Sequence, residues 1–130
     1  ADIILTATPS RAPMIRREWL KPGTHISCVG ADMSGKQELD ARILADARVF
    51  GDDIAQCLRV GECEAAVKQG LLTALAGEIG AVIAQELPGR TDPEQITVFD
   101  STGIALQDLA SAAVILKKAE MLDVGSLCEL

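Results

Sequence analysis

Apolar residues along the chain gather in four short runs that are rich in β-branched side chains and bounded by turn residues. These runs predict strands at residues 3–8, 25–29, 47–50 and 96–99. The first three are nearly continuous in apolar character, which is typical of strands buried on both faces of a parallel sheet. Because helical segments lie between the strands, we expect an α/β fold with a mostly parallel sheet, right-handed crossovers and flanking helices.

The connecting segments predict helices of unequal length. We expect a short helical turn at residues 14–20, helices at 35–46, 62–69, 71–85 and 104–122, and a loop at 87–93. In the second of these segments Leu39, Ile43 and Leu44 share one apolar face. Glu38 lies near the expected N-terminal end of that helix, where a carboxylate is favourable.

The composition narrows the class of protein. A chain of 130 residues suits one domain, and aromatic residues make up only 2% of it, so the core must be Leu, Ile, Val and Ala. A net charge of −7 argues against non-specific binding to nucleic acid. No apolar run reaches the roughly 18 residues that span a membrane, and no basic-then-apolar signal peptide is present. We therefore expect neither nucleic acid nor a membrane as a partner.

The cysteines give no sign of a metal site. Cys28, Cys57, Cys63 and Cys128 show no repeated Cys-x-x-Cys spacing, and His25 is the single histidine, so a zinc site is not expected. Reduced and mostly buried thiols in a cytoplasmic protein are the simpler interpretation.

Small, polar and acidic residues follow all four predicted strands. They occur at residues 8–10, 29–32, 52–53 and 100–103. Parallel strands end at one edge of a sheet, which is where open α/β folds bind ligands. We interpret Ser10, Asp52 and Asp53 as ordinary turn and cap residues. Asp32 and Ser101 are candidates for chemistry.

Residues 30–36, Gly-Ala-Asp-Met-Ser-Gly-Lys, nearly match the phosphate-binding P-loop. The strand before them and the helix expected after them fit that motif, and Asp100 at the end of a later strand would suit magnesium. However, Gln37 replaces the hydroxyl residue that holds the metal, and Asp32 would put a carboxylate inside a cradle for phosphates. A P-loop-like phosphate binder therefore ranks third among the functions considered.

Two longer motifs are Val29-Gly-Ala-Asp-x-x-Gly-Lys-x-Glu-Leu-Asp40 and Ile96-Thr-Val-Phe-Asp-Ser-Thr-Gly103. Shorter ones lie at residues 2–10, 20–26, 61–62, 88–90 and 105–109. Each motif is short, but together they run through almost the whole chain. In that order and spacing they resemble the ornithine cyclodeaminase/μ-crystallin family.

The resemblance implies a Rossmann domain that binds NAD or NADP beside a dimerisation domain, with an amino acid or a cyclic imine as substrate. The family's catalytic aspartate lies in the Val-Gly-x-Asp motif, so the resemblance assigns to Asp32 the role of accepting and returning protons at the substrate amine. It assigns cofactor contacts to Thr8, Val29, Gly30, Lys36 and Ser101, and a substrate contact to Thr102.

The glycine-rich dinucleotide fingerprint, Gly-x-Gly-x-x-Gly, is missing from the sequence. In the resembling family it precedes the matched segment, as do the basic residues that bind substrate. We therefore expect residues 1–103 to form the second half of an incomplete Rossmann-like domain. Residues 104–130 would be a long helix and a loose tail, returning toward a dimerisation domain that this chain lacks. The apolar face around Leu109 and Leu116 would then need another cover, so we expect a homo-oligomer.

The preferred function is thus part of an NAD(P)-dependent amino-acid or imine oxidoreductase or cyclodeaminase. As an isolated chain it would be inactive and would bind NAD(P) weakly or not at all. The alternative is a non-catalytic, μ-crystallin-like protein that binds NAD(P) or another small molecule. Since such proteins can lack the aspartate, the presence of Asp32 favours an enzyme.

Overall fold

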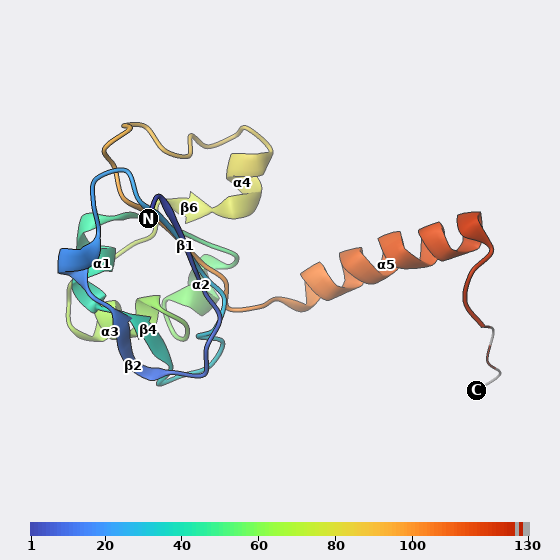
Figure 1. Ribbon diagram of the computed structural model, residues 1–130, viewed down its shortest axis with the longest axis horizontal. Coiled ribbons are helices and arrows are strands. Elements are labelled where there is room, and N and C mark those ends of the chain that lie inside the picture. The colour runs from blue at the N-terminus through green and yellow to red at the C-terminus, as the bar shows by residue number, and fades with distance from the viewer. Residues whose placement is uncertain (127, 129–130) are drawn as a thin grey trace.

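A five-stranded parallel sheet organises the chain in the computed structural model, which describes residues 1–126 and 128 (Figure 1). The strands lie in the order β1 (Ile3–Thr6), β3 (His25–Cys28), β7 (Thr97–Asp100), β5 (Arg48–Gly51) and β6 (Gly77–Glu78). Every neighbouring pair is parallel. The prediction of a mostly parallel α/β sheet is confirmed, and all four predicted strands are present.

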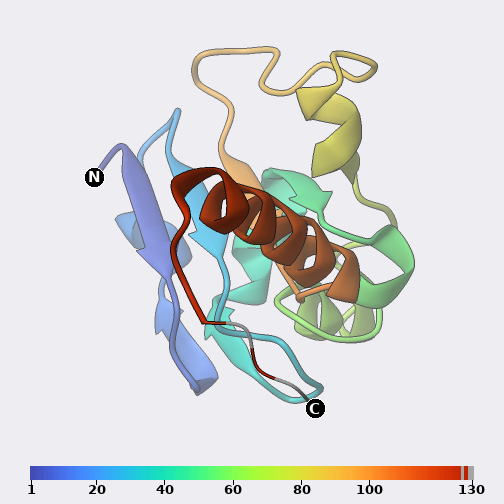
Figure 2. The ribbon, with the colours of Figure 1, turned by 90° about the vertical axis from the view of Figure 1, so that its right-hand side faces the viewer.

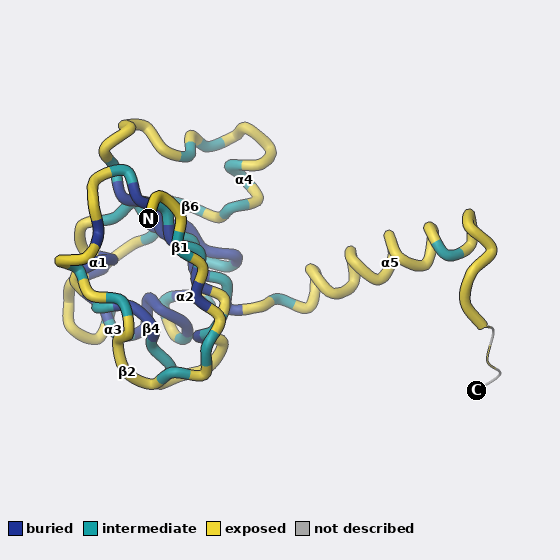
Figure 3. Tube along the Cα trace, in the orientation of Figure 1, coloured by how far each residue is buried: buried dark blue, intermediate teal, exposed yellow. Residues whose placement is uncertain are grey.

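The sheet buries its central strands beneath short helices. Ile26, Val49 and Val98 come from β3, β5 and β7 and are at most 2% exposed. Ile43 and Leu44 of α1 (Ala41–Asp46) and Ala66 of α3 (Cys63–Lys68) belong to the same core. In Figure 3 the buried stretches, in dark blue, lie within the body of the molecule, whereas α5 is mostly exposed. The core is aliphatic, as the scarcity of aromatic residues required.

The expected helix at 35–46 is wrong in its first half. Residues Gln37–Leu39 form β4, which pairs in parallel with β2 (Arg11–Ile15) as a small second sheet. The helix α1 begins only at Ala41, where the Asp40 side chain accepts a hydrogen bond from the backbone N–H of Arg42. Leu39 and Ile43 are both buried, but from a strand and a helix rather than from one helical face.

The expected helix at 71–85 is also wrong. Gly77 and Glu78 form the edge strand β6, and only Ile79–Ile83 are helical, as α4. At Gly77 an added Cβ would lie 2.2 Å from the end of the Leu87 side chain, which would have to move. Gly77 and Glu78 pair with Phe50 and Gly51 of β5, and this pairing replaces the expected helical turn.

The remaining elements agree better with expectation. A 3-10 turn, Arg17–Trp19, lies within the 14–20 segment, although β2 was not foreseen just before it. α3 falls within 62–69, and no helix or strand interrupts 87–93. The short α2 (Ile54–Cys57) was not predicted. Of the tail that was expected to be loose, residues 127, 129 and 130 lie outside the described part of the chain.

The last helix, α5 (Ala105–Leu122), projects away from the body of the molecule (Figure 1). The view in Figure 2 is turned so that this side faces the viewer, with β1 at one lateral edge of the sheet. None of the 18 residues of α5, all of them described, is buried, and Leu109 and Leu116 are 67% and 62% exposed. In the described part of the chain no helix has both the length and the apolarity to cross a membrane.

Candidate functional site

The exits of four adjacent strands, β1, β3, β7 and β5, meet at one edge of the sheet. The backbone N–H of Val29 donates to Thr6 O at 2.9 Å, that of Ser101 to Cys28 O at 2.9 Å, and that of Asp52 to Asp100 O at 3.2 Å. These bonds continue the parallel ladders one residue past the strands. The structure therefore brings together the loops that carry the candidate residues, at the edge where such sheets bind ligands.

Asp32 lies in the loop after β3 and pairs with Lys36. The Lys36 Nζ atom is 2.5 Å from Asp32 Oδ1 and also donates to Gly30 O at 3.3 Å. The side chain of Asp32 is 52% exposed, whereas that of Lys36 is 15% exposed. The hydrogen bond from Lys36 lowers the pKa of Asp32, which is therefore a carboxylate at neutral pH. Lys36 was expected in the first turn of a helix, but it lies in the loop directly before β4. From there its Nζ atom contacts Asp32.

Thr8 and Gly30 approach each other closely at the exits of β1 and β3. A Cβ on Gly30 would lie 2.4 Å from both the backbone nitrogen and the carbonyl oxygen of Thr8. Only glycine permits this approach. Thr8 donates its N–H to Glu38 Oε1 at 2.6 Å, and its hydroxyl accepts the N–H of Ser10 at 3.2 Å. Val29, the residue directly after β3, is 44% exposed.

The loop after β7 is held by Asp52 at the end of β5. The two carboxylate oxygens of Asp52 accept hydrogen bonds from Thr102 Oγ1 at 2.8 Å, Gly103 N at 2.8 Å and Ser101 Oγ at 3.3 Å. Thr102 Oγ1 also accepts from Gln56 at 2.9 Å, and Thr102 is 4% exposed. The hydroxyl of Thr102 is therefore used inside the protein, and its substrate-facing role finds no support in this geometry. Ser101 is half-buried, and its hydroxyl makes only the long hydrogen bond of 3.3 Å to Asp52, so the hydroxyl oxygen can still accept a hydrogen bond from a ligand.

The roles of Asp52 and Asp53 agree with their interpretation as turn and cap residues. Asp53 is the N-cap of α2, where its side chain accepts from Gln56 N at 2.7 Å. Asp52 shapes the neighbouring loop without facing outward, since it is 7% exposed.

The P-loop interpretation fails in this geometry. A strand rather than a helix follows Lys36, so the chain lacks the helix that a P-loop begins directly after its lysine. The Gly35 N–H donates to Glu64 Oε2 at 2.7 Å, and Ser34 Oγ donates to Glu64 Oε1 at 2.5 Å. The anion that this glycine loop binds is thus the carboxylate of Glu64. Together with Lys68, these two donors lower its pKa to about 2.

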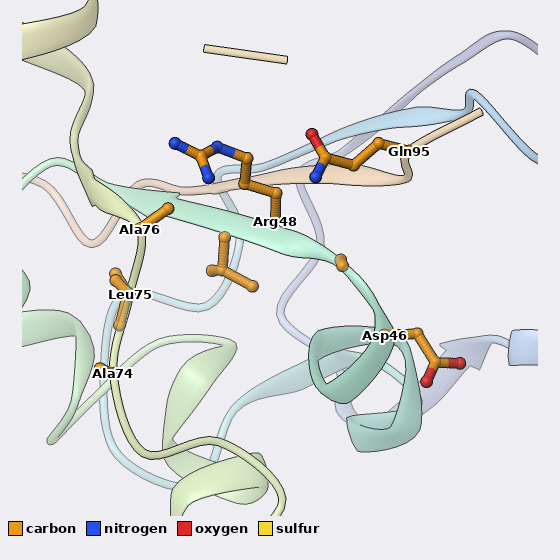
Figure 4. Close-up of a pocket in the computed structure, with 8 residues that line it drawn as sticks. Asp46, Arg48, Ala74, Leu75, Ala76 and Gln95 are labelled. Atoms are coloured by element: carbon orange, nitrogen blue, oxygen red, sulfur yellow. The ribbon is translucent and has the colours of Figure 1, made fainter. Parts of the chain in front are cut away.

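An open pocket lies at the opposite edge of the sheet, away from these loops (Figure 4). Its volume is about 350 Å³, and its lining includes Asp46, Arg48 and Gln95, at the amino ends of β5 and β7. Parallel sheets bind cofactors at their carboxyl ends. The pocket is therefore separate from the candidate site.

The model of the ornithine cyclodeaminase/mu-crystallin family matches residues 1–122 of the sequence. The chain belongs to this family. It is 46% identical over 127 residues to the alanine dehydrogenase of Archaeoglobus fulgidus, covering 96% of this chain and 39% of that protein. It is 44% identical over 131 residues to the iminosuccinate reductase of Paracoccus denitrificans, covering all of this chain and 41% of the reductase. The chain thus spans about two fifths of the length of these relatives.

Two solved structures of homologues have folds very similar to that of this chain. An archaeal alanine dehydrogenase dimer with bound NAD superposes with a TM-score of 0.92 at 44% identity, over all of this chain and 41% of that one. The iminosuccinate reductase of Paracoccus denitrificans in complex with NAD⁺ gives 0.92 at 43% identity, over all of this chain and 40% of that one. The family resemblance and the Rossmann-like fold are therefore confirmed, and homologues with this fold bind NAD.

The residues at the sheet edge fit the nicotinamide end of such a cofactor. Val29 offers exposed apolar surface to a flat ring, and the hydroxyls of Thr8 and Ser101 lie on the strand exits on either side. The exposed carboxylate of Asp32 belongs to the same loop as Val29. An apolar face flanked by hydroxyls, with an acid–base group nearby, is the donor set that a nicotinamide site requires.

Reasoning from sequence missed the buried acids beneath this edge. Glu38, Glu62 and Asp100 are 0%, 1% and 0% exposed and accept backbone N–H groups from neighbouring segments. Burial raises the pKa of Glu62 to about 7 and that of Asp100 to about 6. The sequence did contain a signal for their burial. Each acid stands directly beside an apolar residue or a glycine: Glu38 precedes Leu39, Glu62 follows Gly61 and Asp100 follows Phe99.

Proposed function

We propose that this chain is the nicotinamide-binding part of an NAD(P)-dependent enzyme that oxidises an amino acid or reduces an imine, with cyclodeaminase activity as a variant of the same chemistry. The observation that carries the proposal is the placement of Asp32. It is an exposed carboxylate in the loop after β3, the same loop that exposes Val29, in a family whose homologues bind NAD.

Asp32 is proposed as the acid–base group. Since Lys36 lowers its pKa, Asp32 is ionised before substrate arrives and accepts a hydrogen bond or a proton from the substrate amine. In the reverse direction it returns that proton to the nitrogen. Lys36 does not reach past Asp32 toward solvent, so we assign it the role of orienting Asp32 and holding it charged.

Thr8, Val29, Gly30 and Ser101 are proposed to contact the cofactor. Val29 would pack against the ring, the two hydroxyls would bind its carboxamide or ribose, and Gly30 would keep the strand exits close enough to form one surface. The nicotinamide, when bound, supplies hydride transfer to or from the substrate carbon. Thr102 is proposed only to shape the loop that carries Ser101, through its bond to Asp52.

The chain spans about two fifths of its relatives, so the complete activity is proposed for a longer polypeptide. That polypeptide would add the pyrophosphate-binding glycine loop and the basic residues for the substrate carboxylate. We propose a cytoplasmic homo-oligomer, in line with the three buried free thiols and with the exposed apolar surface of α5. The 130-residue chain alone is then expected to be inactive and to bind NAD(P) weakly.

A non-catalytic binding protein is the main alternative, and turnover separates the two. The complete polypeptide should be assayed with NAD and NADP against a panel of amino acids, and with reduced cofactors against cyclic and acyclic imines. The proposal predicts cofactor-dependent turnover of at least one substrate. Tight cofactor binding without turnover of any of them would favour the binding protein.

A further inference from the structure

Three buried carboxyl groups form a continuous series beneath the candidate site. Glu38 Oε1 accepts the N–H of Thr8 at 2.6 Å. Glu62 in turn accepts the N–H of Glu38 at 2.5 Å and that of Leu39 at 2.9 Å. Asp100 accepts the N–H of Glu62 at 3.2 Å and that of Cys63 at 3.0 Å. Glu62 therefore fixes the backbone that carries Glu38, and Asp100 fixes the backbone that carries Glu62.

The series connects the two loops that carry candidate cofactor residues. Its first member bonds Thr8, just after β1, and its last member, Asp100, is the final residue of β7 and adjoins Ser101. Between them the series passes through β4 and the N-terminal end of α3. Thr8 and Ser101 lie on different strands, separated in the sheet by β3. This series is a connection between them that does not depend on the sheet ladder.

No cation accompanies these acids. Among the residues that the structure describes, Glu38, Glu62 and Asp100 make no ion pair with Lys, Arg or His. Burial of an unpaired carboxylate is unfavourable, and the backbone N–H groups only partly offset it. Each acid accepts at least one buried backbone N–H, so an apolar side chain of the same size would leave a donor without a partner.

The contact between Glu38 and Thr8 is the most constrained link. A Cβ on Gly30 would lie 2.6 Å from Glu38 Oε1 and 2.4 Å from Thr8 N, so these three residues meet at one point. The second oxygen, Glu38 Oε2, has no hydrogen-bond partner within the described residues. One hydrogen bond, donated by the Thr8 N–H to a completely buried acid, thus helps set how the β1 exit lies against the β3 exit.

We propose that Glu38, supported by Glu62 and Asp100, is a positioning residue that holds Thr8 and Ser101 at the spacing required by the nicotinamide end of the cofactor. This inference rests on the proposed function. It adds that cofactor affinity is controlled from beneath the site by an acid that touches neither the cofactor nor the substrate. Asp32 is outside the series, so the proton-transfer step should be nearly independent of it.

The test is Glu38→Met in the complete enzyme, with the exposed Glu86→Met as its control. Methionine has a similar length but no oxygen that can accept the Thr8 N–H, so the KM and Kd for NAD(H) should rise about tenfold, with kcat changed much less. Glu38→Asp keeps the carboxyl group but withdraws it by one methylene, so it should weaken cofactor binding in the same direction. Glu38→Asp also serves as the test if Glu38→Met does not fold. The control should match the wild type.

A spectroscopic readout separates this inference from the proposed function. The Thr8 amide proton should be strongly deshielded and slow to exchange in the wild type, and should lose both properties in Glu38→Met while the Cys63 amide keeps them. If the wild type binds cofactor and Glu38→Met binds it equally well, the positioning role is overturned. If the wild type binds neither NAD nor NADP, the proposed function fails, and with it the cofactor part of the inference. An unchanged Thr8 amide in the variant would overturn the Glu38 link itself.

Discussion

The Nζ atom of Lys36 lies 2.5 Å from Oδ1 of Asp32, and the two residues are four positions apart in the loop between β3 and β4. The lysine is mostly covered and the aspartate mostly open, so the pair presents a carboxylate to solvent with its counter-charge behind it. This arrangement keeps Asp32 ionised and limits its rotation.

Replacing Lys36 by Met should raise the pKa of Asp32, because the hydrogen bond from Lys36 is the main cause of its lowering. The carboxylate form would then be lost at a higher pH than in the wild type. The acid limb of the profile of log kcat/KM against pH should therefore move to higher pH. Lys21→Met, which removes an exposed partner of Asp2, is the control and should leave the limb in place. If the acid limb of the Lys36→Met profile stays at the wild-type pH, Lys36 does not set the pKa of the group that controls activity.

Gly30→Ala should destabilise the chain by about 1–3 kcal/mol, because the new methyl group meets the backbone of Thr8 rather than a movable side chain. Gly80→Ala is the matched control, since no atom lies within 4 Å of the added Cβ and the residue is in α4. It should be neutral or stabilise by about 0.5–1 kcal/mol. Urea denaturation of both variants measures the difference, and equal stabilities would contradict the close approach of the β1 and β3 exits.

Glu64→Gln should loosen the loop around Ser34 and Gly35 and lower the free energy of unfolding by about 1–3 kcal/mol at neutral pH. In the folded chain the pKa of Glu64 lies at about 2, below its ordinary value of 4.5. Its contribution is thus fully present above pH 4.5 and is lost as the pH falls toward 2. The difference in free energy of unfolding between wild type and Glu64→Gln should therefore shrink as the pH falls from 4.5 to 2. Glu94→Gln, at an exposed position, should match the wild type in free energy of unfolding at every pH.

The apolar surface of α5 should drive self-association of the 130-residue chain. Leu109 and Leu116 are seven residues apart on one side of the helix, and both are largely exposed. The double variant Leu109→Lys, Leu116→Lys should be monomeric by light scattering at concentrations where the wild type associates. Gln69→Lys with Thr73→Lys adds the same charge to the body of the molecule and should not dissociate it. A wild-type chain that stays monomeric throughout would contradict the expectation.

The sequence predicted the parts of the fold that depend on local pattern. The nearly continuous apolar runs around Ile26 and Val49 identified buried parallel strands, and the exits of those strands identified the edge that carries Asp32. The segment around Glu38 could not be assigned in this way, because its apolar spacing suits a helix as well as a strand. The deciding contacts are distant in sequence: Glu62 accepts its N–H groups, and β2 pairs beside it.

The sequence predicted which edge of the sheet carries the candidate residues, but not the hydrogen bonds that their side chains make. The family motif pointed to Asp32, Lys36 and Ser101, and the structure places the loops that carry them at one edge of the sheet. It could not show that the hydroxyl of Thr102 is taken by Asp52, or that Glu64 fills the glycine loop, since both partners come from elsewhere in the chain. Which polar atoms remain available to a ligand is a property of the packed structure.

The most direct test of the account is Asp32→Asn in the complete enzyme, with cofactor affinity and turnover measured on the same preparation. The amide keeps the shape and a hydrogen-bonding oxygen but cannot take a proton at neutral pH. Turnover should fall by at least about a hundredfold while the Kd for NAD(H) stays close to that of the wild type. Turnover equal to the wild type would remove Asp32 from the chemistry and contradict the proposed function of this site.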